Sequence, residues 1–417
     1  MIVERNSYLQ SLIVRQHNGM IKVITGIRRS GKSFLLFRLF KQHLQEQGID
    51  EGHIICIALD DRMNRKLRDP DNLCDYVRSQ IKDSQMYYIM LDEVQFVSEF
   101  EDVLNSFLHI PNVDIYVTGS NARFLSKDVI TEFRGRGDEV RIYPLSFREY
   151  LSVWNGSRER ALDEYMTYGG LPQILSLGSA EQKTTYLKNL FIETYITDIK
   201  ERYRIQRDEE LEELINIISS SIGSLTNPNK VANTFKSVKN INLDQTTIKS
   251  YLDYLCDSFL VERAMRYDVK GRHYIGTPSK YYFTDLGLRN ARLNFRQDER
   301  THIMENIIYN ELRIRDFNVD IGIVPTTYTD EMGVRRKKQL EIDFVCNKGS
   351  RRYYVQSAYH IGSDEKRLQE QASLIKVNDS FKKIVVVGDD IAIHRNDQGI
   401  TTMSLMDFLT NEQSLDL

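Results

Sequence analysis

Short apolar runs punctuate the first 150 residues, and each is followed by glycine or by polar side chains. The runs that begin the segments 21–33, 87–93 and 114–122 have the length and composition of strands, and the stretch that follows residue 33 is apolar with helical spacing. Between about 160 and 225, apolar residues recur three and four positions apart, which is typical of helices. The pattern predicts an α/β domain with a parallel sheet, followed by a helical lid.

The second half of the chain shows two further patterns. Three helical stretches precede two short strand-like runs on either side of a turn at 270–272, and this order describes a winged helix. From about residue 300 onward the order is helix, two strands, helix and strand, at 302–315, 339–347, 351–361, 364–377 and 382–389. A C-terminal α/β domain is therefore expected.

Length and composition agree with several folded domains. The 417 residues suggest two to four domains, which we place at 1–155, 156–225, 226–296 and 297–417. The 56 Lys and Arg against 59 Asp and Glu give a net charge of −3, which excludes a globally basic nucleic-acid coat. No apolar run approaches the ~20 residues needed to span a bilayer, and the N-terminus is charged. We expect a cytoplasmic protein without membrane contact, whose four scattered cysteines are reduced.

A complete phosphate-binding motif follows the first strand. The sequence GIRRSGKS has glycines that let backbone N–H groups approach phosphate oxygens, and the following helix directs its positive end at the anion. Lys32 is expected to reach the terminal phosphates and Ser33 to bind Mg²⁺. The predicted ATP-binding residues are Gly26, Ile27, Arg28, Arg29, Ser30, Gly31, Lys32, Ser33 and Phe34.

A second strand ends in two carboxylates, in the pattern called Walker B. Asp92 is expected to hold Mg²⁺, directly or through water, and Glu93 to act as general base on the attacking water. The pair makes hydrolysis of ATP a better interpretation than storage of nucleotide.

Two polar segments further on are candidates for catalytic contacts. Thr118, Ser120 and Asn121 end the third strand, where a hydroxyl or amide group would meet the γ-phosphate or the water, although this sequence also favours an ordinary turn. Arg134 and Arg136 lie in a glycine-containing turn. Either arginine is a candidate finger that neutralises transition-state charge, in cis or across a subunit interface, or else a solvated loop residue.

Several of these motifs together resemble one known family. They are Arg5 and Tyr8, GIRRSGKS at 26–33, LDEVQ at 91–95, TGSN at 118–121, GR at 135–136, YPLSFREYL at 143–151 and YGGLP at 168–172. The chain resembles the predicted AAA-type ATPases of bacteria and archaea that carry a C-terminal nuclease-like domain. The resemblance implies an AAA-like P-loop ATP site with Ser120 or Asn121 as sensor, and Arg136, or alternatively Arg134, as finger.

Charge is segregated along the chain. Residues 228–292 contain 11 Lys and Arg against 6 Asp and Glu, a local charge of +5. In a DNA-binding winged helix, Thr247 and Lys249 would face the groove, while Lys270 and Arg272 would touch phosphate. The alternative is a winged helix used only for packing and subunit contact.

The C-terminal pattern resembles restriction-endonuclease-like folds, whose active members hold Mg²⁺ between strand-borne carboxylates and use a lysine to activate water. Glu305 and Asp343 stand where such acids are expected. At the position of a Glu-x-Lys unit, however, the sequence has Gln356, Ser357 and Ala358, so a metal ligand and the catalytic lysine are missing. We expect a degenerate nuclease domain that binds nucleic acid or a partner without cutting.

Three functions are compatible with these features. The first is a Mg²⁺-dependent ATPase whose hydrolysis drives conformational change on DNA. The second is a regulatory NTPase switch that binds a protein partner, and the third, less favoured, is an ATP-gated nuclease. An oligomer is compatible with each of them, and a finger acting in trans would require one.

Overall fold

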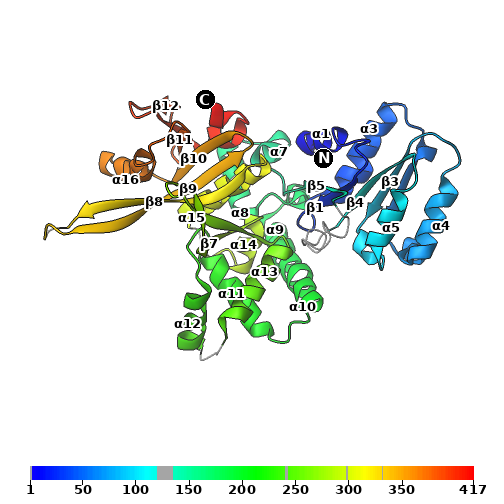
Figure 1. Ribbon diagram of the computed structural model, residues 1–417, viewed down its shortest axis with the longest axis horizontal. Helices are drawn as coiled ribbons and strands as arrows, with labels where there is room; N and C mark the ends of the chain where they lie inside the picture. The colour runs from blue at the N-terminus through cyan, green and yellow to red at the C-terminus, as the bar shows by residue number, and fades with distance from the viewer. Residues whose placement is uncertain (1, 120–134, 240–242, 297–298, 331) are drawn as a thin grey trace. The chain divides into compact units, whose positions relative to one another are not determined.

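The computed structural model describes every residue except 1, 120–134, 240–242, 297–298 and 331 (Figure 1). The chain divides into two compact units. Unit 1 consists of Met1–Leu145, Leu171–Gln173 and Asp257–Phe259, and unit 2 of Ser146–Gly170, Ile174–Cys256 and Leu260–Leu417.

Unit 1 is built on a five-stranded parallel sheet with the order β2-β3-β4-β1-β5. The strands are β1 (Ile21–Thr25), β2 (Ile54–Ala58), β3 (Tyr87–Asp92), β4 (Val113–Thr118) and β5 (Gly137–Arg141). Every residue of β1 and β3 is buried, as expected for central parallel strands with helices on both faces. The predicted parallel α/β sheet is confirmed.

Helices cover both faces of this sheet. On one face, α4 (Pro70–Gln80) and α5 (Phe100–Phe107) pack Leu73, Leu104 and their neighbours against the strands. On the other lie α1 (Asn6–Ile13) and a continuous helical body formed by α2 (Lys32–Phe34), a π-helical segment (Leu35–Phe40) and α3 (Lys41–Glu46). Short 3₁₀ turns occupy Glu51–His53, Arg62–Arg68 and Val94–Phe96.

Unit 2 begins with helices, as the apolar spacing predicts. They are α7 (Phe147–Ser152), α8 (Arg158–Tyr168), α9 (Ala180–Asn189), a π-helical segment (Leu190–Ile196), α10 (Thr197–Tyr203), α11 (Asp208–Ser220), α12 (Pro228–Lys239) and α13 (Gln245–Asp257). Capping boxes at Ser146 and Ser179 fix the starts of α7 and α9. A 3₁₀ turn covers Pro172–Ser176.

An eight-stranded mixed sheet forms the rest of unit 2, in the order β12-β13-β11-β10-β9-β8-β6-β7. Its strands are β6 (Val261–Asp268), β7 (His273–Phe283), β8 (Asn318–Thr329), β9 (Arg335–Lys348), β10 (Arg351–Ala358), β11 (Lys382–Val387), β12 (His394–Arg395) and β13 (Ile400–Ser404). The accompanying helices are α14 (Leu286–Arg292), α15 (Arg300–Ile314), α16 (Asp364–Ile375) and α17 (Leu405–Thr410), with a last 3₁₀ turn at Ser414–Asp416.

The expected hairpin after α13 is present, since β6 and β7 pair antiparallel. It is not isolated, because β6 also pairs in parallel with β8 over Arg266–Asp268 and thereby joins the C-terminal strands. The order of three helices and a hairpin is found, while its role as a winged helix stays a prediction.

Three strands of this sheet, β8, β12 and β13, were absent from the sequence-based expectation. β8 contains Asp320 and Pro325, which weaken a strand pattern. Pro325 is tolerated because β8 pairs with β6 only through Ile321–Ile323, so the proline lies beyond that pairing. Past this point β8 and β9 continue as an exposed two-stranded arm (Figure 1).

Candidate ATP site and a buried acidic cluster

The loop between β1 and α2 has the backbone of a phosphate cradle. Gly26 has φ of 141°, and a Cβ there would lie 2.0 Å from the carbonyl oxygen of Ile142. Gly31 has φ of 96° immediately before α2. Both positions therefore require glycine, one for space and conformation and the other for conformation.

Lys32 is the first residue of α2, and its side chain returns across the loop. Its Nζ donates to the carbonyl oxygens of Gly26 (3.0 Å) and Ile27 (3.1 Å). Burial lowers the pKa of Lys32 to about 8, although the carboxylates of Glu93 and Asp92 oppose this effect. A buried ammonium group that faces two carboxylates is well placed to meet phosphate oxygens.

Asp92 ends β3 and is held from two sides. Its carboxylate accepts a hydrogen bond from the Thr118 hydroxyl at the end of β4 and another from Ser33. Burial raises the pKa of Asp92, and these two hydrogen bonds oppose the rise. The predicted Mg²⁺ residues, Ser33 and Asp92, are thus brought together.

Glu93 follows with a φ of 53°, in the left-handed region, so the extended backbone of β3 ends at Asp92. Its amide N donates to Thr118 Oγ1 over 3.0 Å, and its carboxylate accepts a hydrogen bond from the Gln95 amide group. Thr118 is fully buried. Thr118 therefore holds the Asp92 carboxylate and the Glu93 backbone amide, and the nucleotide contact considered for it in the sequence stays a prediction.

Arg5 supports the loop from behind, and no local sequence signal gives it this role. It is 6% exposed, and its guanidinium donates to the carbonyl oxygens of Ser30 (3.1 Å) and Tyr143 (2.7 Å). Its Cζ also lies 4.5 Å from the centre of the Tyr8 ring. Arg5 and Tyr8 thus anchor the phosphate loop to the segment after β5.

Arg136, the candidate arginine that the structure describes, does not lie at this site within the unit. Arg136 is exposed, and its carbonyl oxygen accepts a hydrogen bond from Ile21 N, at the amino end of β1. The phosphate loop begins at the other end of β1, about 16 Å away at 3.3 Å per residue. Ser120, Asn121 and Arg134 lie outside the described residues.

Comparisons with known proteins agree with this geometry. Residues 18–151 match the family model of an AAA domain, and residues 159–299 match a domain of unknown function. An uncharacterised protein of Haemophilus influenzae is 33% identical over 393 residues, which cover 93% of this chain and 94% of that protein. The chain belongs to this family of AAA-domain proteins.

An uncharacterised protein of Methanocaldococcus jannaschii is 27% identical and covers 89% of this chain and 82% of its own length. Among solved structures, the Walker-type ATPase of Pyrococcus abyssi aligns with a TM-score of 0.50 at 15% identity, covering 70% of this chain and 96% of that one. This likeness shows a P-loop ATPase fold. In the described part of this family member, no helix has the length and apolar character to cross a membrane.

In unit 2, the predicted residues of the degenerate nuclease site come together. Glu305 lies on α15, Asp343 on β9 and Gln356 on β10. Gln356 Oε1 accepts a hydrogen bond from Asp343 N over 3.3 Å, and Asp343 Oδ2 accepts one from Ser357 N over 2.8 Å. The predicted proximity of the three elements is therefore present.

Lys280 on β7 also belongs to this cluster, which the sequence did not indicate. Its Nζ lies 2.9 Å from Glu305 Oε1, 2.8 Å from Glu341 Oε1 and 4.0 Å from Asp343 Oδ1. Tyr282 Oη donates to Glu305 Oε1 over 2.7 Å. The ammonium group thus has three carboxylates as its counter-ions.

The electrostatics of the cluster follow from burial. Burial raises the pKa of Asp343 well above its usual value and the charge of Glu305 adds to this, while Lys280 opposes it. Burial tends to lower the pKa of Lys280, but the three carboxylates overcome this and raise it. A cavity of about 230 Å³ opens beside Glu341 and Gln356. Within the described residues, no group of three or more His, Cys, Asp or Glu is arranged to hold a metal ion.

The four predicted nucleic-acid residues fall on two elements. Thr247 and Lys249 lie in the first turns of α13, where Thr247 N donates to the capping carboxylate of Asp244 over 2.7 Å. Lys270 and Arg272 lie in the β6–β7 turn, and both line a separate cavity that Thr247 and Lys249 do not line. The two pairs do not share one described site.

Proposed function

We propose that this protein binds ATP with Mg²⁺ in unit 1, hydrolyses it, and uses the cycle to change conformation while it acts on DNA through unit 2. The observation that carries the proposal is the convergence of Lys32, Asp92 and Glu93 at the carboxyl edge of the unit 1 sheet. In open α/β sheets this edge is where ligands bind.

The donor set around Ser33 and Asp92 fits Mg²⁺, which prefers hard oxygen ligands in a nearly octahedral arrangement. A hydroxyl and a carboxylate already in hydrogen-bonding contact supply two such oxygens. When bound, the ion neutralises charge on the β- and γ-phosphates. Ser33 and Asp92 would hold it there.

The other side chains have distinct roles. The loop amides between Gly26 and Lys32 would donate to the phosphates, and the Lys32 ammonium would exchange its two carbonyl partners for phosphate oxygens. Glu93 would accept a proton from the attacking water, with its backbone fixed by Thr118. Arg136 is our proposed finger only in trans, because it lies at the opposite edge of its own sheet.

Support for DNA as the substrate comes from the positive charge of residues 228–292. Contacts with phosphate are assigned to Lys270 and Arg272, and Thr247 and Lys249 are assigned to the groove. Cleavage is not part of the proposal, because Gln356 and Ala358 replace the catalytic pair and the acids are already paired with Lys280.

Turnover of ATP with and without single-stranded and duplex DNA, at two salt concentrations, tests this function. We expect DNA to stimulate turnover, and the stimulation to weaken as salt rises. Stimulation by a protein partner and not by DNA would instead support the regulatory switch, and nicking of a plasmid with Mg²⁺ would support the nuclease.

A further inference from the structure

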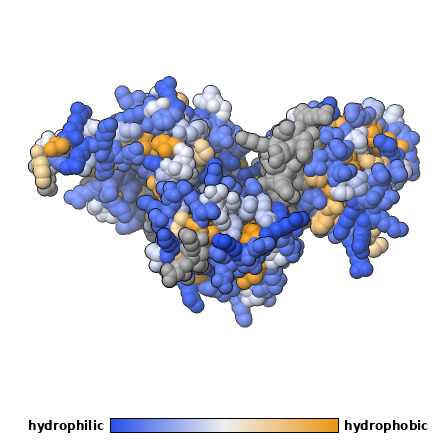
Figure 2. All heavy atoms as spheres, turned by 60° about the horizontal axis from the view of Figure 1, so that its bottom comes forward, coloured by the Kyte–Doolittle hydropathy of each residue, from blue (hydrophilic) through white to orange (hydrophobic). Residues whose placement is uncertain are grey.

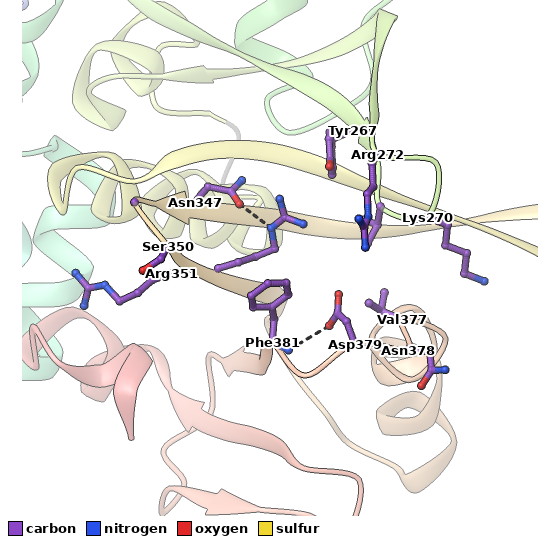
Figure 3. Close-up of a pocket in the computed structure, with 13 residues that line it drawn as sticks. Tyr267, Lys270, Arg272, Asn347, Ser350, Arg351, Val377, Asn378, Asp379 and Phe381 are labelled. Carbon is purple, nitrogen blue, oxygen red and sulfur yellow. Dashed lines mark hydrogen bonds between the residues drawn. The ribbon is translucent and has the colours of Figure 1, made fainter.

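A basic cavity of about 560 Å³ lies in unit 2 (Figure 3), and its lining contains none of the residues of the acidic cluster. Three segments form its wall: the β6–β7 turn with Lys270 and Arg272, the β9–β10 turn with the first β10 residue Arg351, and the segment between α16 and β11 with Asp379 and Phe381. Its volume falls within the range of roughly 300–1,000 Å³ found for small-molecule sites.

The lining is strongly positive. Lys270, Arg272, Arg351 and Arg352 are its four cations and Asp379 its one carboxylate, which leaves a charge of +3. Both oxygens of Asp379 are already engaged, since they accept hydrogen bonds from Tyr354 Oη (2.6 Å) and Phe381 N (3.2 Å). The cavity therefore favours an anion.

The cations differ in how freely they can act. Lys270 Nζ donates to the carbonyl oxygen of Pro325 over 3.0 Å, and Arg351 lies 3.7 Å from Asp416. The guanidinium of Arg272 has no hydrogen-bond or ion-pair partner among the described residues, and Figure 3 shows it directed into the cavity. Arg272 is thus the cation best placed to take a ligand phosphate.

Aromatic rings accompany the charges. Arg352 Cζ lies 5.6 Å from the centre of the Tyr267 ring and 5.3 Å from that of Phe381, and its Nε donates to Asn347 Oδ1 over 2.7 Å. Arg352 is thus held between two rings. It also interacts electrostatically with Asp320 on β8. Phe381 remains 39% exposed and faces the cavity (Figure 3).

We propose that this cavity binds one nucleotide unit of a single-stranded nucleic acid, with the phosphate at Arg272 and the base stacked on Phe381. Basic grooves with exposed aromatic rings bind single strands in this way, because every base has a face that can stack. A duplex keeps its bases stacked inside and would leave Phe381 unused. This inference deepens the DNA part of the proposed function and rests on it.

The experiment is fluorescence anisotropy of a labelled twelve-residue oligothymidylate with the full chain, without ATP, at several salt concentrations. Arg272→Ala should weaken binding and reduce the salt slope by about 0.7, the value for one lost phosphate contact on a single strand. Phe381→Leu should weaken binding by about 5- to 150-fold through lost stacking, and Phe381→Trp should restore it. Arg160→Ala, an exposed arginine of α8, is the matched control and should bind as the wild type does.

Competition with unlabelled thymidine monophosphate and with a duplex of equal length identifies the source of the nucleotide. The inference would be overturned if Arg272→Ala and Phe381→Leu bound the single strand as tightly as the wild type does. It would also be overturned if the protein bound only the free nucleotide or only the duplex. ATP turnover of the wild type is measured separately. Turnover of ATP without binding of the single strand would refute the single-strand site but not the ATPase function. Binding of the single strand without turnover would refute the ATPase function but not the site.

Discussion

Replacing Lys280 by methionine removes the ammonium group that Glu305, Glu341 and Asp343 share. Lys280 is 4% exposed, so water has little access to the carboxylates that lose their counter-ion. Removing one partner of a buried ion pair typically costs about 3–5 kcal/mol, because an uncompensated buried charge remains. For a unit of this size that cost corresponds to a fall in Tm of roughly 6 to 20 °C.

The loss should depend on pH in a defined direction. The raised pKa of Lys280 means that its stabilisation is fully present below the unfolded-state pKa, about 10.4, and is lost only as pH rises through the higher folded-state value. In the variant, burial and the charge of Glu305 still raise the pKa of Asp343, and Lys280 no longer opposes this rise, so the folded state becomes less stable as pH rises toward the folded-state pKa of Asp343. The difference between the two proteins should therefore be larger at pH 8 than at pH 5.

Thermal unfolding at both pH values measures this difference. Lys376→Met is the matched control, because Lys376 is exposed at the end of α16, and its effect should stay within about 0.5 kcal/mol. A loss below about 1 kcal/mol for Lys280→Met, or one that does not grow with pH, would refute the reasoning.

Three further predictions concern the ATP site. Thr118→Val should lower kcat with little change in KM, because the substitution releases the Asp92 carboxylate and the Glu93 amide. Steady-state kinetics checks this, with Thr234→Val, at an exposed threonine of α12, as the control. A kcat of Thr118→Val equal to that of the control would contradict the prediction. Affinity for ATP should fall above about pH 8, where Lys32 loses its proton in the free protein, and a constant Kd from pH 7 to 9.5 by calorimetry would count against the role of Lys32. Arg136→Ala should lower turnover but leave ATP affinity unchanged, and wild-type turnover per chain should rise with protein concentration; turnover independent of concentration would exclude a finger in trans.

The features that could be predicted from the sequence are local ones. Gly26–Ser33 and Asp92–Glu93 are contiguous motifs at strand ends, so parallel pairing alone brings them to one edge. Glu305, Asp343 and Gln356 were placed by the order of helix and strands. In each case, the local motif and the order of the elements are enough to predict which residues lie together.

Features that depend on distant pairings could not be predicted. Lys280 meets its acids only because β6 joins β8 and brings the hairpin into the C-terminal sheet. Arg136 lies at the amino edge of the sheet because β5 pairs with β1 so that Gly137, the next residue, is opposite Ile21. Arg5 reaches Tyr143 across 138 positions of sequence, which no local periodicity indicates.

The central claim is that unit 1 hydrolyses ATP at the β1–α2 loop. Phosphate release by Lys32→Ala, compared with the wild type and with Lys66→Ala in an exposed turn of the same unit, tests it most directly. The account predicts that Lys32→Ala loses turnover while Lys66→Ala retains it. Unchanged turnover in Lys32→Ala would contradict it.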